Sequence, residues 1–251
     1  ADFILENLKI QTNVIEKSWR SGVRRFLFLG SSCIYPKYSK QPIVEEALLT
    51  GELEPTNSAY GIAKITGIKL CNSLREQYNF DCINLMPTNL YGPKDNYAYE
   101  TSHVLPSLIR KFYEARLKSE KEVICWGTGN ALREFLHSDD LGDACVFALE
   151  KWNPDDKLAP KDDYGNLLNI LNVGSGKEVS IKKLTEIISK TVGYKGAIKW
   201  DINMPDGTPK KLLDISRIRD LGWVSKIDLE EGIKLTYKNF SNSYNTGDLR
   251  L

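Results

Sequence analysis

Residues 26–38, FLFLGSSCIYPKY, contain the segment that decides the fold. Four apolar residues, typical of a short buried strand, are followed directly by Gly30. Ser31, Ser32 and Cys33 then place two hydroxyls and a thiol where that strand would end. In an open α/β sheet, ligands bind at the carboxyl ends of the strands. The stretch therefore has two interpretations: polar groups that contact a substrate, or a turn that only ends the strand.

The segments around this stretch alternate between helical and strand patterns. Apolar residues spaced near 3.6 predict helices, and short apolar runs bounded by glycine or proline predict strands. Ser180 is a candidate cap for the helix that contains Leu184 and Val192, and we expect residues 88–93 to form a loop. The alternation indicates an α/β fold with a doubly wound parallel sheet. The predicted helices are 2–20, 58–78, 101–118, 139–152 and 228–240, and the predicted strands are 24–30, 82–87, 123–127 and 169–176.

Composition argues against several classes of function. The chain has 34 Lys and Arg against 33 Asp and Glu, a net charge of +1, so we expect neither nucleic acid nor a membrane surface as a partner. No apolar run reaches the roughly 18 residues of a membrane span. The five cysteines are scattered and form no CxxC pair. They fit reduced thiols in a cytoplasmic protein better than a disulfide framework or a zinc site, and we expect no metal.

Tyr60 and Lys64 lie four residues apart in a predicted helix and therefore share one face. A nearby ammonium favours the tyrosinate, so we expect Lys64 to lower the pKa of Tyr60, and such a tyrosine can donate a proton to a forming alkoxide. Taken alone the pair is a weak signal, because a surface tyrosine beside a solvated lysine has the same spacing. Ser31, at the end of the preceding strand, could share the oxygen that Tyr60 protonates.

Ser31, Tyr60 and Lys64, in this order on a strand end and the next helix, resemble the reducing triad of short-chain dehydrogenases. A narrower resemblance, to the GDP-L-fucose synthase family, covers nearly the whole chain. That family converts GDP-4-keto-6-deoxy-D-mannose to GDP-L-fucose by epimerisation at C3 and C5 and NADPH-dependent reduction at C4. The motifs that are similar, in order and at matching distances, are FLGSSCIYPK, EPTNSAYGIAKITGIKLC, MPTNLYGPKDN, HVLP, WGTGNALREFLHSDD, NVGSG and PDGTPKKLLD.

The resemblance implies catalytic roles. Ser31, Tyr60 and Lys64 would serve the reduction, while Cys33 and His103 would supply the base and the acid of epimerisation. Without the resemblance, a lone cysteine beside a strand is usually a small buried apolar residue, and a lone histidine is usually structural. We assign His137 to that structural class.

The resemblance also implies binding residues. Arg133 would bind the pyrophosphate, a task that suits a bidentate guanidinium. Substrate contacts would further include Lys111, Trp126 and Asp206. The residues expected to contact NADP(H) are Leu29, Gly30, Ser31, Ser32, Tyr60, Lys64, Pro87, Thr88, Asn89, Leu90 and His103.

The architecture that the resemblance implies is a Rossmann-type sheet with a smaller mixed α/β substrate domain. Residues 1–93 and about 132–175 would form the NADP-binding domain, and about 94–131 and 176–251 the GDP-sugar domain. Family members pair through the helices that correspond to about 2–20 and 58–77 here. We therefore expect a homodimer.

Dinucleotide sites use a glycine-rich turn between the first strand and the first helix, and this turn has no counterpart in the sequence. GTGNAL (127–132) and GSGKEV (174–179) contain two glycines each and do not follow a first strand. We therefore expect the chain to be a C-terminal fragment, with N-terminal strands of the sheet outside it. Two βα units and a strand would need roughly 60 to 80 residues. We expect the parent protein to bind NADPH, and the activity of the chain alone stays open.

Two alternatives stay open at this point. The first is another nucleotide-sugar epimerase or dehydratase, which Cys33 disfavours because a dehydratase generally needs a carboxylate at that strand end. The second is a non-catalytic nucleotide-sugar-binding module, which the absent glycine turn favours. The joint presence of five catalytic residue types argues against it: Ser31, Cys33, Tyr60, Lys64 and His103.

Overall fold

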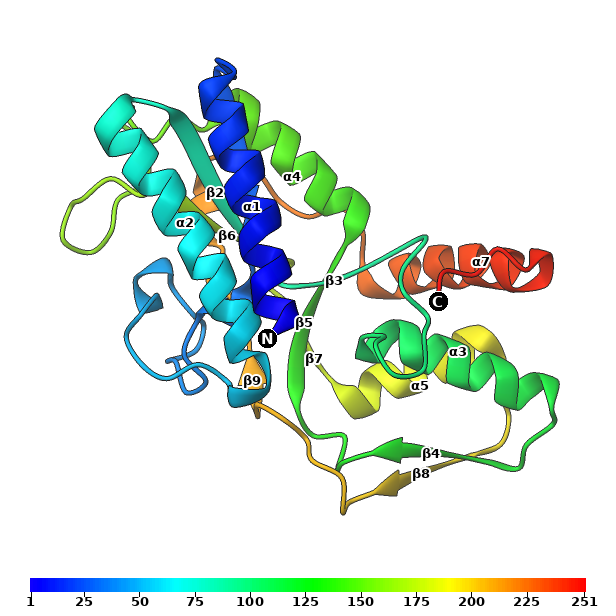
Figure 1. Cartoon of the computed structure of the whole chain (residues 1–251). Helices are drawn as coiled ribbons and strands as arrows, with labels where there is room; N and C mark the ends of the chain where they lie inside the picture. The colour runs from blue at the N-terminus through cyan, green and yellow to red at the C-terminus, as the bar shows by residue number, and fades with distance from the viewer. The chain divides into compact units, whose positions relative to one another are not determined.

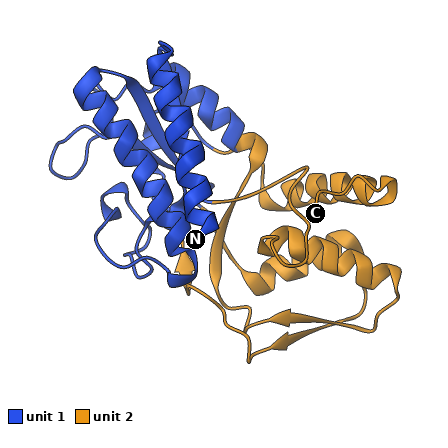
Figure 2. Cartoon of the chain, in the orientation of Figure 1, with its two compact units in different colours: residues 1–88, 141–176, 212–224 blue, residues 89–140, 177–211, 225–251 orange.

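The computed structural model describes all 251 residues, which form two compact units (Figure 2). Unit 1 comprises Ala1–Thr88, Leu141–Gly176 and Leu212–Val224, and unit 2 comprises Asn89–Asp140, Lys177–Lys211 and Ser225–Leu251. These bounds differ from the predicted domains at three segments. Residues 89–93 and 132–140 lie in unit 2, where β3 pairs with β5, and residues 212–224 lie in unit 1, where Ile43 pairs with Leu213.

Unit 1 contains a three-stranded parallel sheet in the order β1-β2-β6. Its strands are β1 (Arg25–Leu29), β2 (Asp81–Pro87) and β6 (Ile170–Val173), which confirms three of the predicted strands. Leu29 pairs with Leu85, and Leu85 pairs with Leu171. All residues of β2 after Asp81 are buried, as expected for a parallel strand covered on both faces.

Helices α1 (Asp2–Arg20) and α2 (Ser58–Tyr78) lie side by side in unit 1 (Figure 1). A Cβ atom at Gly67 would lie 2.4 Å from Cζ of Phe28, so glycine lets α2 approach β1 closely. Ile15, Ile68 and Met86 are fully buried in the core between these elements. The other helical elements that contribute to unit 1 are η1 (Ser32–Ile34), η2 (Glu45–Ala47), η3 (Pro55–Asn57), α4 (Ser138–Lys151) and α6 (Ser216–Asp220).

Unit 2 is built on three helices, α3 (Val104–Leu117), α5 (Ile181–Val192) and α7 (Leu229–Thr246). Their apolar faces share one core, in which Phe112, Ile188 and Phe240 are fully buried. The hydroxyl of Ser180 accepts a hydrogen bond from the Lys183 N–H at 3.1 Å, which confirms the predicted cap of α5. None of the chain's helices combines the length and the apolar character that a membrane span requires.

The strands of unit 2 form two small sheets. In the first, β5 (Leu132–His137) is parallel to β3 (Asn89–Tyr91) and β9 (Lys210–Lys211) and antiparallel to β7 (Glu178–Ser180). In the second, β4 (Glu122–Trp126) is parallel to β8 (Ala197–Asp201). The predicted loop 88–93 is therefore wrong at residues 89–91, because β5, which the sequence analysis did not predict, supplies a partner strand.

Candidate functional site

The carboxyl end of β1 is a capped turn. Gly30 donates its N–H to the Leu85 carbonyl at 2.9 Å, and a Cβ atom here would lie 2.4 Å from Sδ of Met86. The Ser31 hydroxyl accepts from the Cys33 N–H at 3.1 Å and so caps η1. Ser32 is buried, whereas Ser31 and Cys33 are half-buried. The serines thus complete a turn and also leave a hydroxyl and a thiol at the strand end.

Helix α2 brings Tyr60 to the same turn. The Ser31 hydroxyl and Cys33 both lie close enough to the Tyr60 hydroxyl to affect its pKa. A Cβ atom at Gly61 would lie 2.8 Å from the Cys33 carbonyl oxygen, so the helix touches the turn directly. The structure therefore brings together three predicted catalytic residues.

The expectation that Lys64 lowers the pKa of Tyr60 is wrong. Burial raises the pKa of Tyr60, proximity to Cys33 raises it further, and only the hydrogen bond from Ser31 lowers it. The Lys64 ammonium donates to the Leu29 carbonyl at 2.9 Å and lies 5.7 Å from the centre of the Tyr60 ring. Burial also lowers the pKa of Lys64. Tyr60 therefore holds its proton at neutral pH, which suits a proton donor.

The predicted nicotinamide loop is divided between the units. Pro87 ends β2, and the Thr88 N–H donates to the Val173 carbonyl at 3.0 Å in unit 1. Asn89 begins β3 of unit 2, and its side-chain amide donates to the Glu134 carbonyl at 2.7 Å. Leu90 pairs with Leu136 of β5.

The two histidines have different settings in unit 2. His103 is exposed at the N-cap of α3 and accepts a hydrogen bond from the Ser107 N–H through its carbonyl. Burial raises the pKa of Asp95, and the His103 imidazole acts in the opposite direction, so these side chains interact. His137 is buried, accepts from the Asp139 N–H at 3.2 Å and meets the Tyr91 ring edge-on. These contacts agree with a structural role for His137.

Lys111 and Trp126 are connected through β4. The Lys111 ammonium donates to the Ile124 carbonyl at 3.0 Å and ties α3 to the strand that ends at Trp126. The Trp126 side chain is 66% exposed, so it offers a broad aromatic face on which a nucleobase can stack.

Arg133 and Asp206 meet beside the GTGN turn. Arg133 donates to the Leu132 carbonyl at 2.8 Å and more weakly to the Asp206 carbonyl at 3.5 Å. Burial lowers the pKa of Arg133, and the Asp206 charge opposes this effect. Both carboxylate oxygens of Asp206 accept from Thr128, one from its N–H and one from its hydroxyl, each at 2.7 Å. These bonds lower the pKa of Asp206. Sequence reasoning missed Thr128, whose only signal was its place between two glycines.

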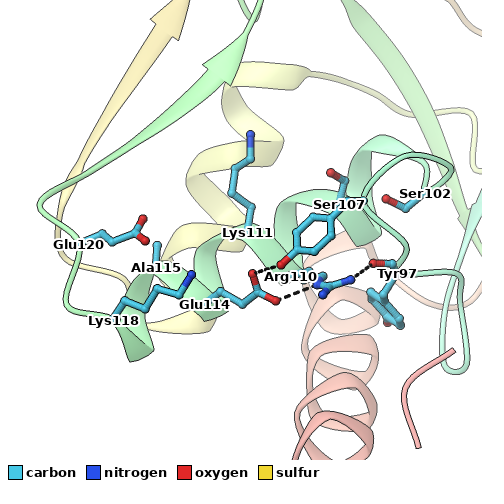
Figure 3. Close-up of a pocket in the computed structure, with 10 residues that line it drawn as sticks. Tyr97, Ser102, Ser107, Arg110, Lys111, Glu114, Ala115, Lys118 and Glu120 are labelled. Carbon is cyan, nitrogen blue, oxygen red and sulfur yellow. Dashed lines mark hydrogen bonds and ion pairs between the residues drawn. The ribbon is translucent and has the colours of Figure 1, made fainter. Parts of the chain in front are cut away.

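A small cleft of about 130 Å³ runs along α3 on the side of Lys111 (Figure 3). Two of its charged side chains are paired, because Glu114 accepts from the Arg110 guanidinium at 2.8 Å, and Glu114 also accepts from the Tyr99 hydroxyl at 2.6 Å. Arg110 also donates to the Tyr97 carbonyl at 2.7 Å and stacks on the Tyr99 ring at 3.7 Å. Arg110 and Glu114 therefore neutralise each other in the lining of the cleft, beside Lys111.

The chain shares sequence with known enzymes. Residues 1–167 match the NAD dependent epimerase/dehydratase family. GDP-L-fucose synthase 1 of Arabidopsis thaliana is 53% identical over 237 residues, which are 94% of this chain and 69% of that protein.

Two solved structures are similar in fold. A GDP-6-OMe-4-keto-L-xylo-heptose reductase from Campylobacter jejuni superposes with a TM-score of 0.90 at 36% identity, over 97% of this chain and 77% of that one. A GDP-L-fucose synthetase from Naegleria fowleri, bound to NADP, superposes with a TM-score of 0.85 at 26% identity, over 98% of this chain and 75% of that one.

Proposed function

Because the chain belongs to the NAD-dependent epimerase/dehydratase family, and within it to the GDP-L-fucose synthases, we propose that it is an NADP-dependent epimerase-reductase. It converts GDP-4-keto-6-deoxy-D-mannose to GDP-L-fucose by epimerisation at C3 and C5 and reduction at C4. The observation that carries this proposal is the meeting of Ser31, Cys33 and Tyr60 at one strand end.

The reduction rests on Tyr60. Its raised pKa keeps the phenol protonated until an alkoxide, a much stronger base, forms at C4 and takes the proton. The Ser31 hydroxyl would bond to the same substrate oxygen that Tyr60 protonates. Lys64 is a further polar side chain on the face of α2 that carries Tyr60. A phenol, an ammonium and strand-end backbone groups fit the ribose and amide of NADP(H), which supplies a hydride when bound. The residues that would hold it are Leu29 to Ser32, Tyr60, Lys64, Pro87 to Leu90 and His103.

The epimerisation uses the acidity of the protons next to the keto group, whose loss gives an enolate. One group must remove a proton from one ring face, and another must return a proton to the opposite face. We assign the base to Cys33 and the acid to His103. Ser31 and Tyr60 stabilise the negative charge on the keto oxygen by hydrogen bonds, as an oxyanion site does.

We propose that unit 1 supplies most of the cofactor-binding residues, with Asn89, Leu90 and His103 added from unit 2, and that unit 2 binds the GDP moiety. Arg133 would pair with the pyrophosphate, because a guanidinium whose hydrogen bonds go only to carbonyl groups still has donors for an anion. The Trp126 ring would stack on the guanine of GDP. Lys111 would support Trp126, because its hydrogen bond to the Ile124 carbonyl holds β4 in place. Asp206 would contact the substrate beside the GTGN turn, since its exposed carboxylate accepts one hydrogen bond per oxygen from Thr128 and keeps further lone pairs.

We further propose a homodimer through about 2–20 and 58–77. Apolar side chains face solvent on both helices: Phe3 is 62% exposed, Ile10 65% and Ile62 49%. Burying such a patch against a second copy would remove it from water. Sedimentation velocity at micromolar concentration tests this proposal, and a monomer mass would contradict it. The five free cysteines support a cytoplasmic location.

The activity is tested by mixing the chain with NADPH and GDP-4-keto-6-deoxy-D-mannose. The proposal predicts a fall in the NADPH absorbance together with formation of GDP-L-fucose. A parallel chimera, in which the N-terminal segment of the Arabidopsis relative precedes residue 1, checks whether further residues are needed. No NADPH oxidation and no GDP-L-fucose from either protein would contradict the proposal.

A further inference from the structure

A buried tyrosine closes the turn that carries Cys33. Tyr35 follows η1 directly, and its N–H donates to the Ser32 carbonyl at 3.4 Å. The Tyr35 side chain is only 4% exposed, and its hydroxyl donates to Oδ1 of Asn172 at 2.6 Å. A polar group two residues after Cys33 is thus tied to strand β6, 137 positions further along the chain.

Asn172 in turn uses its other polar groups on the segment that contains η2. Its side-chain amide donates to the Ile43 carbonyl and its N–H donates to Oε1 of Glu45, each at 2.9 Å. Asn172 and Glu45 are 0% and 2% exposed. The second carboxylate oxygen of Glu45 accepts from Arg217. The hydroxyl of Tyr35 is therefore the first member of a buried chain that ends in an ion pair.

The buried network ends in the ion pair between Glu45 and Arg217. Burial raises the pKa of Glu45, while Asn172 and Arg217 lower it in part. Burial would lower the pKa of Arg217, but its hydrogen bonds to Glu46 and Glu45 raise it well above its ordinary value. Arg217 also contacts Asp163 at 3.9 Å. A fully satisfied network in a low-dielectric interior holds its members rigidly.

The turn is thereby held from two sides. On one side, Gly61 of α2 touches the Cys33 carbonyl, where even a methyl group would collide. On the other, the network Tyr35–Asn172–Glu45–Arg217 anchors the residue that ends the turn. The first anchor lies on α2, the helix that also carries Tyr60 and Lys64, whereas the network through Asn172 holds the turn without any residue of α2.

We propose that Tyr35 is a positioning residue for Cys33, acting through the buried network, so that it serves the epimerisation more than the reduction. This inference rests on the proposed role of Cys33 as the base. The network sets where the thiol lies relative to the end of β1. The reduction depends instead on Tyr60 and Lys64, which are positioned by α2.

The test replaces Tyr35 by phenylalanine, which removes only the hydroxyl. In deuterated water, we expect Tyr35→Phe to slow solvent exchange at C3 and C5 roughly tenfold, which corresponds to the loss of one net hydrogen bond. Oxidation of GDP-L-fucose by NADP⁺ needs only the C4 chemistry. Its rate in Tyr35→Phe should stay within about twofold of the wild-type rate. An equal loss in both reactions would overturn the proposal, because a purely structural role predicts equal losses.

Two control variants are available. Tyr97 is 1% exposed and its hydroxyl has no hydrogen-bond partner, so Tyr97→Phe removes a buried hydroxyl outside the network. Glu46→Gln weakens the Arg217 pair and leaves the bonds of Asn172 in place. Both should keep the wild-type ratio of exchange to oxidation. Glu45→Gln, which alters the network at its ion pair, should shift the ratio in the same direction as Tyr35→Phe.

A second readout needs no turnover. Iodoacetamide labelling of the folded chain, followed by mass spectrometry of the peptide that contains Cys33, reports how the thiol is held. We expect labelling in Tyr35→Phe to be several-fold faster than in wild type, with Tyr97→Phe unchanged. Unchanged labelling would overturn the proposal. If instead Cys33→Ser leaves exchange unchanged while Tyr35→Phe alters labelling, the proposed base is wrong and the anchoring of the turn still stands.

Discussion

The Cys33 N–H donates to the Ser31 hydroxyl at 3.1 Å, so the serine proposed for the reduction also caps the turn that presents the thiol. The Ser31 hydroxyl also interacts with Tyr60 and lowers its pKa. In the proposed mechanism Ser31 and Tyr60 therefore serve both half-reactions, whereas Cys33 serves only the epimerisation. We expect Ser31→Ala to slow both the exchange at C3 and C5 and the oxidation of GDP-L-fucose, and losses in only one of the two would contradict this assignment.

Tyr60→Phe should reduce the rate of the C4 reaction by roughly 10² to 10⁴, the range of positioned proton donors. The measurement is NADP⁺ reduction by GDP-L-fucose at saturating substrate. Tyr38→Phe is the matched control, because the Tyr38 side chain is 82% exposed and lies outside α2. If the rate of Tyr60→Phe is within about twofold of the rate of Tyr38→Phe, Tyr60 is not the proton donor of the reduction.

Gly61→Ala should destabilise the chain by about 1–3 kcal/mol, because its Cβ atom would meet the Cys33 carbonyl at 2.8 Å and the backbone must shift. Gly142→Ala is the matched control in α4. Nothing lies within 4 Å of its Cβ position, so alanine should stabilise the helix by about 0.5–1 kcal/mol. Urea unfolding measures both.

The decisive result is a decrease in unfolding free energy for Gly61→Ala together with an increase for Gly142→Ala. Equal effects would mean that α2 does not touch the turn as described. The position of the thiol would then depend on other contacts.

The elements around the catalytic turn were predictable because their patterns are local. The apolar period over 2–20 and 58–78 and the apolar run before Gly30 correspond to α1, α2 and β1. Ser180 was predictable as a cap because the serine hydroxyl bonds within its own helix. Such features need only neighbouring residues to form.

Features that depend on distant partners were not predictable in this way. Strand β3 forms because β5 lies beside it. The pKa of Tyr60 is set by burial and by Cys33, whereas the spacing of Tyr60 and Lys64 suggested the opposite direction. Asp206 matched a substrate position, yet both of its carboxylate oxygens bind Thr128, 78 positions away.

Glu114→Gln should destabilise the chain by about 1 kcal/mol at neutral pH, because its bonds to Tyr99 and Arg110 are charge-assisted. Burial would raise the pKa of Glu114, but these two bonds together lower it below its ordinary value of 4.5. A lowered pKa in the folded state means that the stabilisation is fully present above pH 4.5 and is lost as the pH falls through the folded pKa.

The check is the difference in unfolding free energy between wild type and Glu114→Gln, measured from pH 7 downward. The difference should be constant to about pH 5 and then shrink. Lys238→Gln, which removes an exposed charge on α7 that no carboxylate pairs with, should show no such decline. A difference that grows as the pH falls would contradict the assignment.

Arg133→Lys should weaken GDP binding about tenfold, since a lysine keeps the charge and loses the planar, bidentate donor geometry. Titration calorimetry with GDP measures the change. Arg219→Lys is the control, because Arg219 is exposed on α6 of unit 1. Equal affinity for Arg133→Lys and wild type would place the pyrophosphate elsewhere.

The central claim, that one chain both epimerises and reduces, is tested most directly in deuterated water with NADPH and GDP-4-keto-6-deoxy-D-mannose. The expected product is GDP-L-fucose with deuterium at C3 and C5, and Cys33→Ser should lose most of that label while Cys145→Ser keeps it. NADPH oxidation that gives a product without deuterium at either carbon would contradict the proposed function, because it would identify a C4 reductase without epimerase activity.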